Sequence, residues 1–138
     1  MAEKQIYITT FDLDRLLDLI DAYRNSGHQK KVPVEMLEKE MERAIIVDPK
    51  NVPSDVITMN STAFLKDLET GEELTWTLVF PKDANAEENR ISILAPIGMA
   101  MLGYRVGSVI EWDVPGGKRR LKVMKTLYQP EASGRFDL

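Results

Sequence analysis

The sequence predicts an α+β protein in which a short antiparallel helical hairpin precedes a mainly antiparallel sheet with one short helix. Apolar residues recur at helical spacing over the first third of the chain, whereas further along they alternate with polar residues as in strands. Val52-Pro53-Ser54-Asp55 separates the two patterns and has the composition of a linker. We therefore expect two units, a helical hairpin over residues 1–50 and a sheet domain over residues 51–138.

The first predicted helix follows a short extended segment, Ile6 to Ile8. Thr10 is a suitable N-cap, and Asp12 and Asp14 would lie near the positive end of the helix. The apolar stripe repeats at i, i+3, i+4 and i+7 and comprises Leu13, Leu16, Leu17 and Ile20. Asn25-Ser26-Gly27 favours a turn and ends the helix.

The second predicted helix begins at Pro33, which suits a first turn because its missing N–H leaves no hydrogen bond unmade. The stripe expected to face the first helix comprises Val34, Leu37, Met41, Ala44 and Ile45. Asp48-Pro49 ends the helix, because the residue before proline avoids the helical conformation. Two helices of about fifteen residues would give a hairpin roughly 22 Å long.

The sheet domain is expected to contain five strands and one helix. In order, these are strands Phe64 to Leu68, Glu73 to Phe80 and Ile91 to Leu94, a helix from Pro96 to Gly103, and strands Val109 to Val114 and Leu121 to Tyr128. The last two strands flank Pro115-Gly116-Gly117-Lys118, whose glycines permit positive φ. Trp76 and Trp112 stand at alternating strand positions and are expected in the core, with a pocket beside them as the alternative that stays open.

The composition is that of an acidic globular chain without cysteine. The 138 residues include 18 Lys and Arg against 22 Asp and Glu, which gives a net charge of −4. A protein partner is therefore expected, with no strong direct nucleic-acid binding and no membrane association. The lack of Cys excludes disulfides and thiolate zinc sites. No stretch approaches the ~20 apolar residues that cross a bilayer and no signal peptide is recognisable, so we expect a cytoplasmic location.

No combination of residues predicts catalysis. His28 is the one histidine and stands in a polar loop without the partners of a metal site or a catalytic triad. Gly116-Gly117-Lys118-Arg119 does not form a phosphate loop, because Trp112 occupies the position of the required first glycine. The Asp and Glu residues of the two predicted helices have the spacing of a solvent-exposed helix face, so they are not interpreted as a pair of catalytic carboxylates. We expect no metal, no cofactor and no enzymatic activity.

One local concentration of positive charge stands on a turn and the edge of a strand. It comprises Lys118, Arg119, Arg120 and Lys122. Two interpretations stay open for it: contact with an acidic partner, or a solvated edge that prevents pairing with further strands. We keep Lys118 and Arg119 as candidate partner-binding residues.

The run from Ser92 to Ser108, with Trp112, Pro115-Gly116-Gly117 and Tyr128 after it, resembles the C-terminal signature of the GreA/GreB transcription elongation factors. Two further stretches resemble the Rnk-like members of that family, regulators of nucleoside diphosphate kinase: Asp55 to Ser61 and Tyr128 to Gly134. The resemblance implies an FKBP-like C-terminal domain that docks at the mouth of the RNA polymerase secondary channel. It also implies an N-terminal coiled coil directed into that channel.

In Gre factors, the tip of a longer hairpin carries acidic residues that help to hold a catalytic magnesium ion for transcript cleavage. The expected tip of this chain, Asn25 to Lys31, contains two lysines and no carboxylate. We therefore expect a polymerase-binding regulator that does not stimulate cleavage and that competes with Gre factors. The resemblance makes Ala95, Pro96 and Ile97 the candidate polymerase contact, with ordinary helix packing as the rival interpretation.

Two alternatives from other functional classes stay open. An FKBP-like topology allows peptidyl-prolyl isomerase activity, although fold alone does not establish it. The name of the Rnk-like group suggests direct binding to nucleoside diphosphate kinase. The sequence also leaves open whether Lys30 and Lys31 contact nucleic acid.

Overall fold

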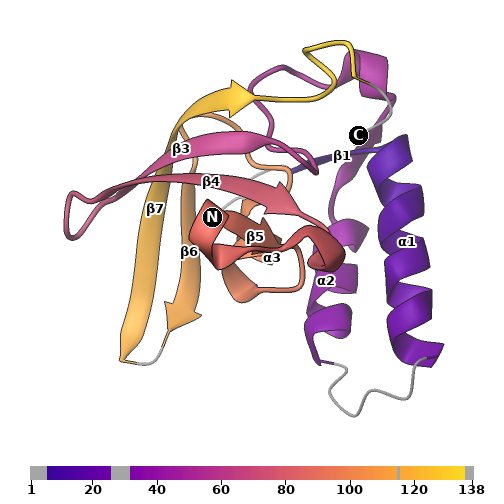
Figure 1. The fold of residues 1–138 in the computed structure, drawn as a ribbon, viewed down its shortest axis with the longest axis horizontal. Coiled ribbons are helices and arrows are strands. Elements are labelled where there is room, and N and C mark those ends of the chain that lie inside the picture. Colours follow the sequence, from indigo (N-terminus) through magenta and orange to yellow (C-terminus); the bar gives the residue numbers. More distant parts are fainter. Residues whose placement is uncertain (1–5, 26–31, 115, 136–138) are drawn as a thin grey trace.

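The computed structural model describes residues 6–25, 32–114 and 116–135. In chain order the elements are β1 (Tyr7–Thr9), α1 (Thr10–Asn25), α2 (Val32–Glu42), β2 (Ile45–Val47), η1 (Pro49–Asn51), β3 (Thr62–Asp67), β4 (Glu73–Val79), η2 (Pro81–Asp83), η3 (Ala86–Glu88), β5 (Arg90–Ser92), α3 (Pro96–Met101), β6 (Val109–Val114) and β7 (Gly117–Tyr128), where η marks a short 3-10 turn. Figure 1 shows two groups of elements, helices α1 and α2 on one side and a curled sheet on the other. The predicted mixed α+β fold is confirmed.

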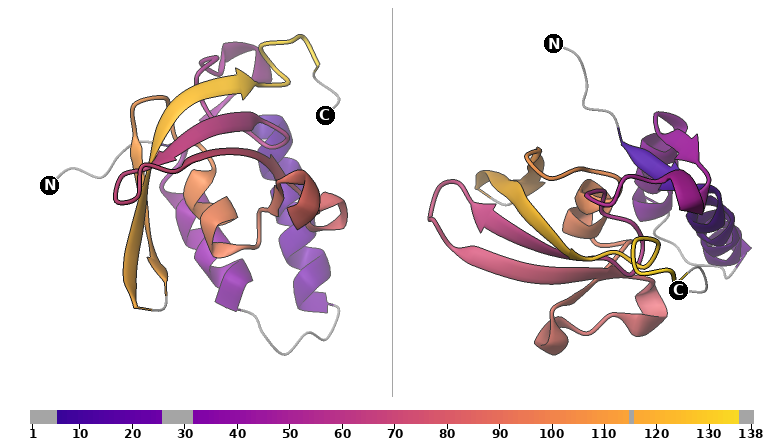
Figure 2. Two further views of the ribbon diagram at one scale, coloured as in Figure 1. Left: turned by 60° about the vertical axis from the view of Figure 1, so that its left-hand side comes forward. Right: turned by 90° about the horizontal axis from the view of Figure 1, so that it is seen from above.

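Five strands form the curled sheet, in the order β5-β4-β3-β7-β6. Neighbouring strands are antiparallel, except that β5 runs parallel to β4. The sheet curls around α3, and α1 and α2 lie side by side next to it (Figures 1 and 2). The β6–β7 turn contains Gly116 and Gly117 at φ values of +91° and +146°, which confirms the positive φ predicted there.

The predicted second helix is too long. α2 ends at Glu42, and Ile45–Val47 forms strand β2, which pairs in parallel with β1. The Ala44 N–H donates to the Met41 carbonyl at 3.2 Å, and the Ile45 N–H already donates to the Ile6 carbonyl at 2.8 Å. Three consecutive β-branched residues favour an extended backbone once a partner strand is present. Ala44 and Ile45 therefore do not continue the helical stripe.

The N-cap prediction for α1 is wrong by one residue. The Asp12 N–H donates to the Thr9 side-chain oxygen at 3.0 Å, and Thr10 is the first helical residue. Thr9 therefore supplies the capping oxygen that satisfies one of the free N–H groups of the first turn. Of the predicted tip, Asn25 ends α1, whereas residues 26–31, with His28, Lys30 and Lys31, lie outside the described residues, as does the side chain of Trp112.

One continuous core joins the N-terminal helices to the sheet. It includes Ile8, Leu16, Ile20, Val34, Leu37 and Met41 from the N-terminal part, and Ile57, Met59, Leu65, Leu78, Met101, Leu121 and Val123 from the rest of the chain. Of the stripe predicted on the first helix, Leu16 and Ile20 are buried, whereas Leu17 is 45% exposed. Each buried Leu contributes about 1.5–3 kcal/mol to folding. The sheet domain thus stabilises both helices, and the boundary between residues 50 and 51 stays a prediction.

No helix in the described ranges combines the length and the apolar character that a bilayer span requires.

Candidate partner-binding corner and the adjoining junction

The corner that leads from β5 into α3 is held by local hydrogen bonds. The Leu94 N–H donates to the Ser92 side-chain oxygen at 3.1 Å, and the Ala95 N–H donates to the Ser92 carbonyl at 3.0 Å. Ala95 has extended backbone angles, φ −73° and ψ 146°, and Pro96 starts the helix. Proline favours this position because its φ is already helical and its missing N–H is not needed there. The corner therefore has a defined backbone before any partner binds.

Gly98 lets α3 approach the strand closely. A Cβ atom at this position would lie 2.0 Å from the Ser92 carbonyl oxygen and 3.2 Å from the Cα of Ile93. Both contacts involve backbone, which cannot rotate away as a side chain does. Only glycine fits here, so the tight contact fixes the height of α3 above the strand.

The three predicted corner residues are exposed to different degrees. Pro96 is exposed, whereas Ala95 and Ile97 are half-buried. Ile97 packs against the main core, as the packing interpretation expected. Pro96 is therefore the residue of this group that the corner offers most fully to a partner.

The other two predicted residues, Lys118 and Arg119, lie on β7 and bind carboxylates of the same sheet. The Lys118 ammonium is 3.1 Å from a Glu111 oxygen. The Arg119 guanidinium donates to Asp67 at 2.8 and 3.3 Å. The hydrogen bond from Arg119 is the largest cause that lowers the pKa of Asp67, followed by bonds from the backbone N–H groups of Glu69 and Thr70. Arg119 therefore braces the β3–β4 turn.

A buried junction ties α1 to the turn before β3. Asp12, only 1% exposed, accepts a hydrogen bond from the Met59 N–H at 3.0 Å and binds the Arg15 guanidinium. Arg15 is in turn packed on two rings, 4.0 Å from the Phe11 centroid and 4.9 Å from that of Phe80. Burial raises the pKa of Asp12 to about 6, although the Met59 and Arg15 hydrogen bonds oppose the shift.

The two stretches that resemble the Rnk-like proteins meet beside this junction. The Thr58 hydroxyl donates to a Glu131 oxygen at 2.7 Å, and the Gln129 amide donates to the Val56 carbonyl at 2.8 Å. Thr58 also pairs with the Ser61 hydroxyl at 2.7 Å. Sequence reasoning missed this network and the role of Asp12, because their partners lie far apart along the chain.

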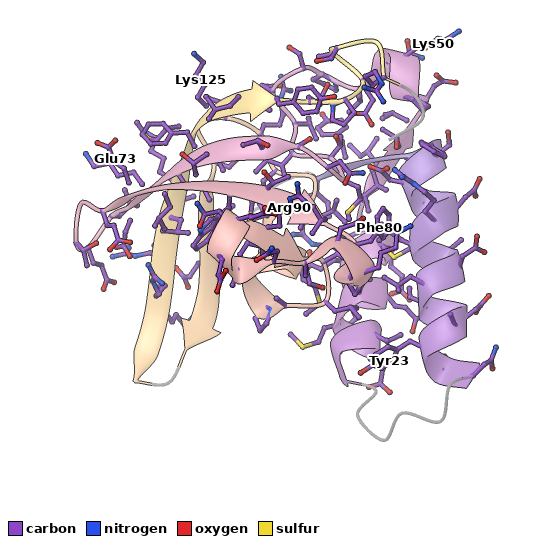
Figure 3. The ribbon with its side chains drawn as sticks, in the orientation of Figure 1. Tyr23, Lys50, Glu73, Phe80, Arg90 and Lys125 are labelled. Carbon is purple, nitrogen blue, oxygen red and sulfur yellow. The ribbon has the colours of Figure 1, made fainter. Side chains whose placement is uncertain are left out.

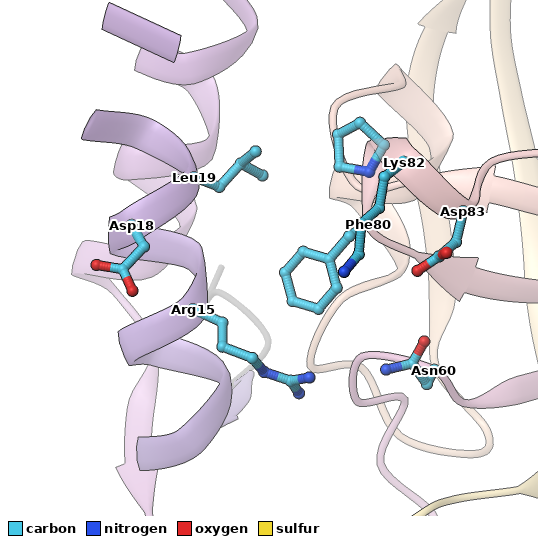
Figure 4. A pocket seen from close by; sticks show the side chains of 8 residues that line it. Arg15, Asp18, Leu19, Asn60, Phe80, Lys82 and Asp83 are labelled. Carbon is cyan, nitrogen blue, oxygen red and sulfur yellow. The ribbon is translucent and has the colours of Figure 1, made fainter. Parts of the chain in front are cut away.

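A cleft of about 680 Å³ opens between α1 and the turn after β4. Its lining comprises Arg15, Asp18, Leu19, Asn60, Phe80, Pro81, Lys82 and Asp83. Figure 4 shows Arg15 and Leu19 reaching from α1 toward Phe80. The walls are largely apolar and the polar groups carry both signs of charge, which suits an apolar group flanked by polar atoms. Among the described residues, no three His, Asp or Glu side chains gather to hold a metal ion.

Two family models match consecutive parts of this chain. The family described as the C-terminal part of transcription elongation factor GreA/GreB matches residues 52–128, and the Rnk N-terminus matches residues 4–47. The chain is 36% identical over 138 residues to the regulator of nucleoside diphosphate kinase of Escherichia coli K12, covering 99% of this chain and 98% of that protein. It is also 36% identical over 122 residues to the transcription inhibitor protein Gfh1 of Thermus aquaticus, covering 81% and 76% of the two chains.

A solved structure has the same arrangement. The prokaryotic transcription elongation factor GreA/GreB from Nitrosomonas europaea superposes with a TM-score of 0.73 at 38% identity, over 91% of this chain and 100% of that chain. The GreA/GreB match spans more than half of this sequence and includes the β5–α3 corner, Gly98, and Lys118 and Arg119. The match to the Rnk N-terminus covers both helices up to β2. The chain therefore belongs to the GreA/GreB family, as a member with an N-terminal part of the Rnk type.

Proposed function

We propose that this chain binds RNA polymerase at the mouth of the secondary channel and competes there with Gre factors without stimulating transcript cleavage. The observation that carries the proposal is the GreA/GreB match over residues 52–128, which includes the whole β5–α3 corner. Membership of the family supports a regulator that associates with polymerase. The sheet domain, which the proposal takes to be FKBP-like, would supply the docking surface.

The β5–α3 corner is the proposed polymerase contact. Its backbone is fixed by the Ser92 hydrogen bonds and by the close approach of Gly98, so docking costs little conformational entropy. Pro96 is apolar, rigid and exposed at the start of α3. A partner that covers it removes apolar surface from water without ordering a flexible side chain. In this proposal Ala95 and Ile97 flank the contact, and Lys118 and Arg119 on β7 are additional partner-binding residues.

The N-terminal helices support a role without cleavage. At ~1.5 Å per residue, α1 with 16 residues and α2 with 11 are roughly 24 and 16 Å long. The sequence between them, residues 26–31, contains no carboxylate that could hold a magnesium ion. The similarity to a protein named as a transcription inhibitor fits the same interpretation. The proposal treats the two helices as a coiled coil that enters the channel without catalytic groups.

Competition for core RNA polymerase tests this function directly. Immobilised polymerase is incubated with the full chain, with and without excess GreB, and stalled elongation complexes are assayed for transcript cleavage. We expect binding that GreB displaces, no cleavage by this chain, and slower cleavage by GreB when both are present. Binding that GreB leaves unchanged, or cleavage by this chain alone, would contradict the proposal.

Pro96→Asp tests the corner. Asp is tolerated at the start of a helix, where it lies near the positive end of the helix dipole, so the fold should persist. We expect at least a tenfold loss of polymerase affinity, equivalent to about 1.4 kcal/mol. Leu68→Asp is the matched control, because Leu68 is a 44%-exposed apolar residue on the β3–β4 turn. Equal losses for the two variants would remove the corner from the interface.

Direct control of nucleoside diphosphate kinase is a second candidate function. It rests on the name of the Escherichia coli relative, which is similar to this chain over its whole length. The proposal in that case is binding between two proteins, with no catalysis by this chain. Sedimentation of the two purified proteins, alone and mixed, should then reveal a complex. Independent sedimentation at concentrations of about 50 µM would remove this candidate.

A further inference from the structure

The part of the outer sheet face that is formed by β3 and residues 122–128 of β7 points away from the three helices and carries three lysines and two aromatic rings. Strand pairing places Lys66 opposite Lys122, Phe64 opposite Lys125, and Thr62 opposite Tyr128. Their neighbours Leu65 and Val123 point inward and are fully buried in the core, so the alternation of strands directs these residues to the opposite face. Figure 3 shows Lys125 and Glu73 pointing away from the helices.

Two β-bulges add large apolar residues to β7. The register shifts between Phe64 and Leu65, and again between Thr62 and Ala63, so Met124 and Leu127 have no partner on β3. Both are exposed, by 40% and 49%. A bulge places two residues opposite one, which sets Met124 beside Lys125 and Leu127 beside Tyr128. The outer face is then defined by Phe64, Lys66, Lys122, Met124, Lys125, Leu127 and Tyr128.

The lysines of the outer face are not neutralised within the described part of the chain. None of the three lysines forms an ion pair with a described residue. Glu73 on β4 is the strand partner of Lys66 on the side away from β7, so the positive charge of the outer face ends at β4. Lys66 and Lys122 stand directly opposite one another, and like charges in such a pair destabilise the sheet. An anion bound between them would relieve that repulsion.

We propose that the outer face binds single-stranded nucleic acid, with the lysines on phosphates and the rings of Phe64 and Tyr128 against bases. Cations beside accessible aromatic rings on an open sheet are the features by which proteins hold single strands without reading their sequence, and the rings of Phe64 and Tyr128 are each half-buried. Phe64 and Lys125 are direct strand partners, and Phe64 is half-buried whereas Lys125 is exposed. The ring and the ammonium group can therefore contact the base and the phosphate of one nucleotide. This binding is separate from the proposed polymerase contact at the corner.

An acidic protein would match the charge of the outer face but not its composition. Lysine is depleted in protein–protein interfaces, whereas phosphate contacts use it readily. The net charge of −4 for the whole chain opposes long-range attraction, so the affinity depends on these local contacts. Binding should therefore be weak and strongly dependent on salt.

Fluorescence anisotropy of a labelled oligouridine RNA of about twelve nucleotides, titrated with the full chain, tests the proposal. Three phosphate contacts to a single strand predict a slope of about −2 in log affinity against log salt. The triple variant K66Q/K122Q/K125Q should bind at least about tenfold more weakly and flatten that slope. Phe64→Leu should weaken binding about fivefold or more and leave the slope unchanged, because it removes stacking and no charge.

The control variant K39Q/K50Q/K82Q removes the same charge from exposed lysines on other faces. It should bind RNA within about twofold of the wild type, if binding is local rather than due to net charge. Thermal unfolding checks that every variant is folded. The proposal fails if the control loses as much affinity as the outer-face variant, or if no saturable binding occurs at about 25 mM salt. It also fails if a polyglutamate peptide binds this face and RNA does not.

Discussion

The β5–α3 corner and the junction around Asp12 each fix a helix to the sheet domain, but they use different interactions. At the corner, backbone hydrogen bonds to Ser92 and the contact made by Gly98 hold α3, and Pro96 remains exposed. At the junction, the side chains themselves hold α1, because Asp12 binds both Arg15 and the Met59 N–H. The corner therefore leaves a side chain available to a partner, whereas the junction uses the side chains of Asp12 and Arg15 for contacts within the fold.

Gly98→Ala should have the largest effect on stability, because it breaks the corner at its backbone contact. Gly→Ala inside a helix usually stabilises by up to ~1 kcal/mol. Here the added Cβ would meet the Ser92 carbonyl oxygen at 2.0 Å, so we expect a loss of about 3 kcal/mol or more. Urea unfolding measures the difference.

Gly71→Ala is the matched control for that substitution. Gly71 has φ +77°, and a Cβ there meets nothing within 4 Å, so only the left-handed backbone opposes it. Its expected cost is about 1–2 kcal/mol. If Gly98→Ala were no worse than Gly71→Ala, close packing would not be what fixes the corner.

Asp12→Asn sharpens the comparison through pH. The pKa of Asp12 is about 6 in the folded protein against an ordinary 3.8, so the folded state binds this proton more tightly than the unfolded state. The stability that the protonated Asp12 carboxyl contributes is therefore fully present below pH about 4 and is lost as pH rises through 6. The unfolding free energy of the wild type should therefore fall by up to ~3 kcal/mol relative to Asp12→Asn between pH 4 and 8. Denaturant titrations at several pH values measure both curves, and parallel curves would contradict the assignment.

The smallest predicted effect separates two cations near the start of β7, Lys118 and Arg119. Arg119→Ala should lower Tm, because it removes two hydrogen bonds from the Asp67 carboxylate, whose side chain is only 5% exposed. Lys118→Ala should leave Tm almost unchanged, because both members of its pair with Glu111 are well exposed. The Arg119→Ala difference should shrink at low pH, because the lowered pKa of Asp67 makes its contribution disappear on protonation. Equal shifts in Tm for the two variants would contradict the predicted difference between the Arg119–Asp67 and Lys118–Glu111 pairs.

The elements that sequence reasoning found are those with a strong local pattern. The alternation of Leu74, Trp76 and Leu78 identifies β4, and Pro96 identifies the start of α3. Strand β2 was missed, since Ala44 and Ile45 fit a helical stripe equally well until Tyr7–Thr9 is known to lie beside them. Short apolar runs are ambiguous without their partners.

Much of the candidate site depends on contacts that a linear pattern does not contain. Pro96 and its neighbours could be identified by resemblance, because the whole corner lies in one continuous run. The Asp12–Met59 contact, the Thr58–Glu131 hydrogen bond and the two bulges of β7 each join distant parts of the chain. The sequence correctly predicted Asp12 as a negative charge near the start of a helix, but it did not predict that this carboxyl is buried.

The parallel pairing of β1 with β2 anchors both ends of the helical segment in one small sheet. Tyr7 lies opposite Ile45 and Thr9 opposite Val47, so residues 10–44 leave the pair after Thr9 and return to its other end at Ile45. A segment inserted between two adjacent anchor strands can change in length with little loss of closure entropy. The length of the helical segment can therefore differ between relatives as long as its buried contacts are kept. An exchange of residues 10–44 that retains Asp12 and the buried core residues Leu16 and Leu37 should yield folded chimaeras.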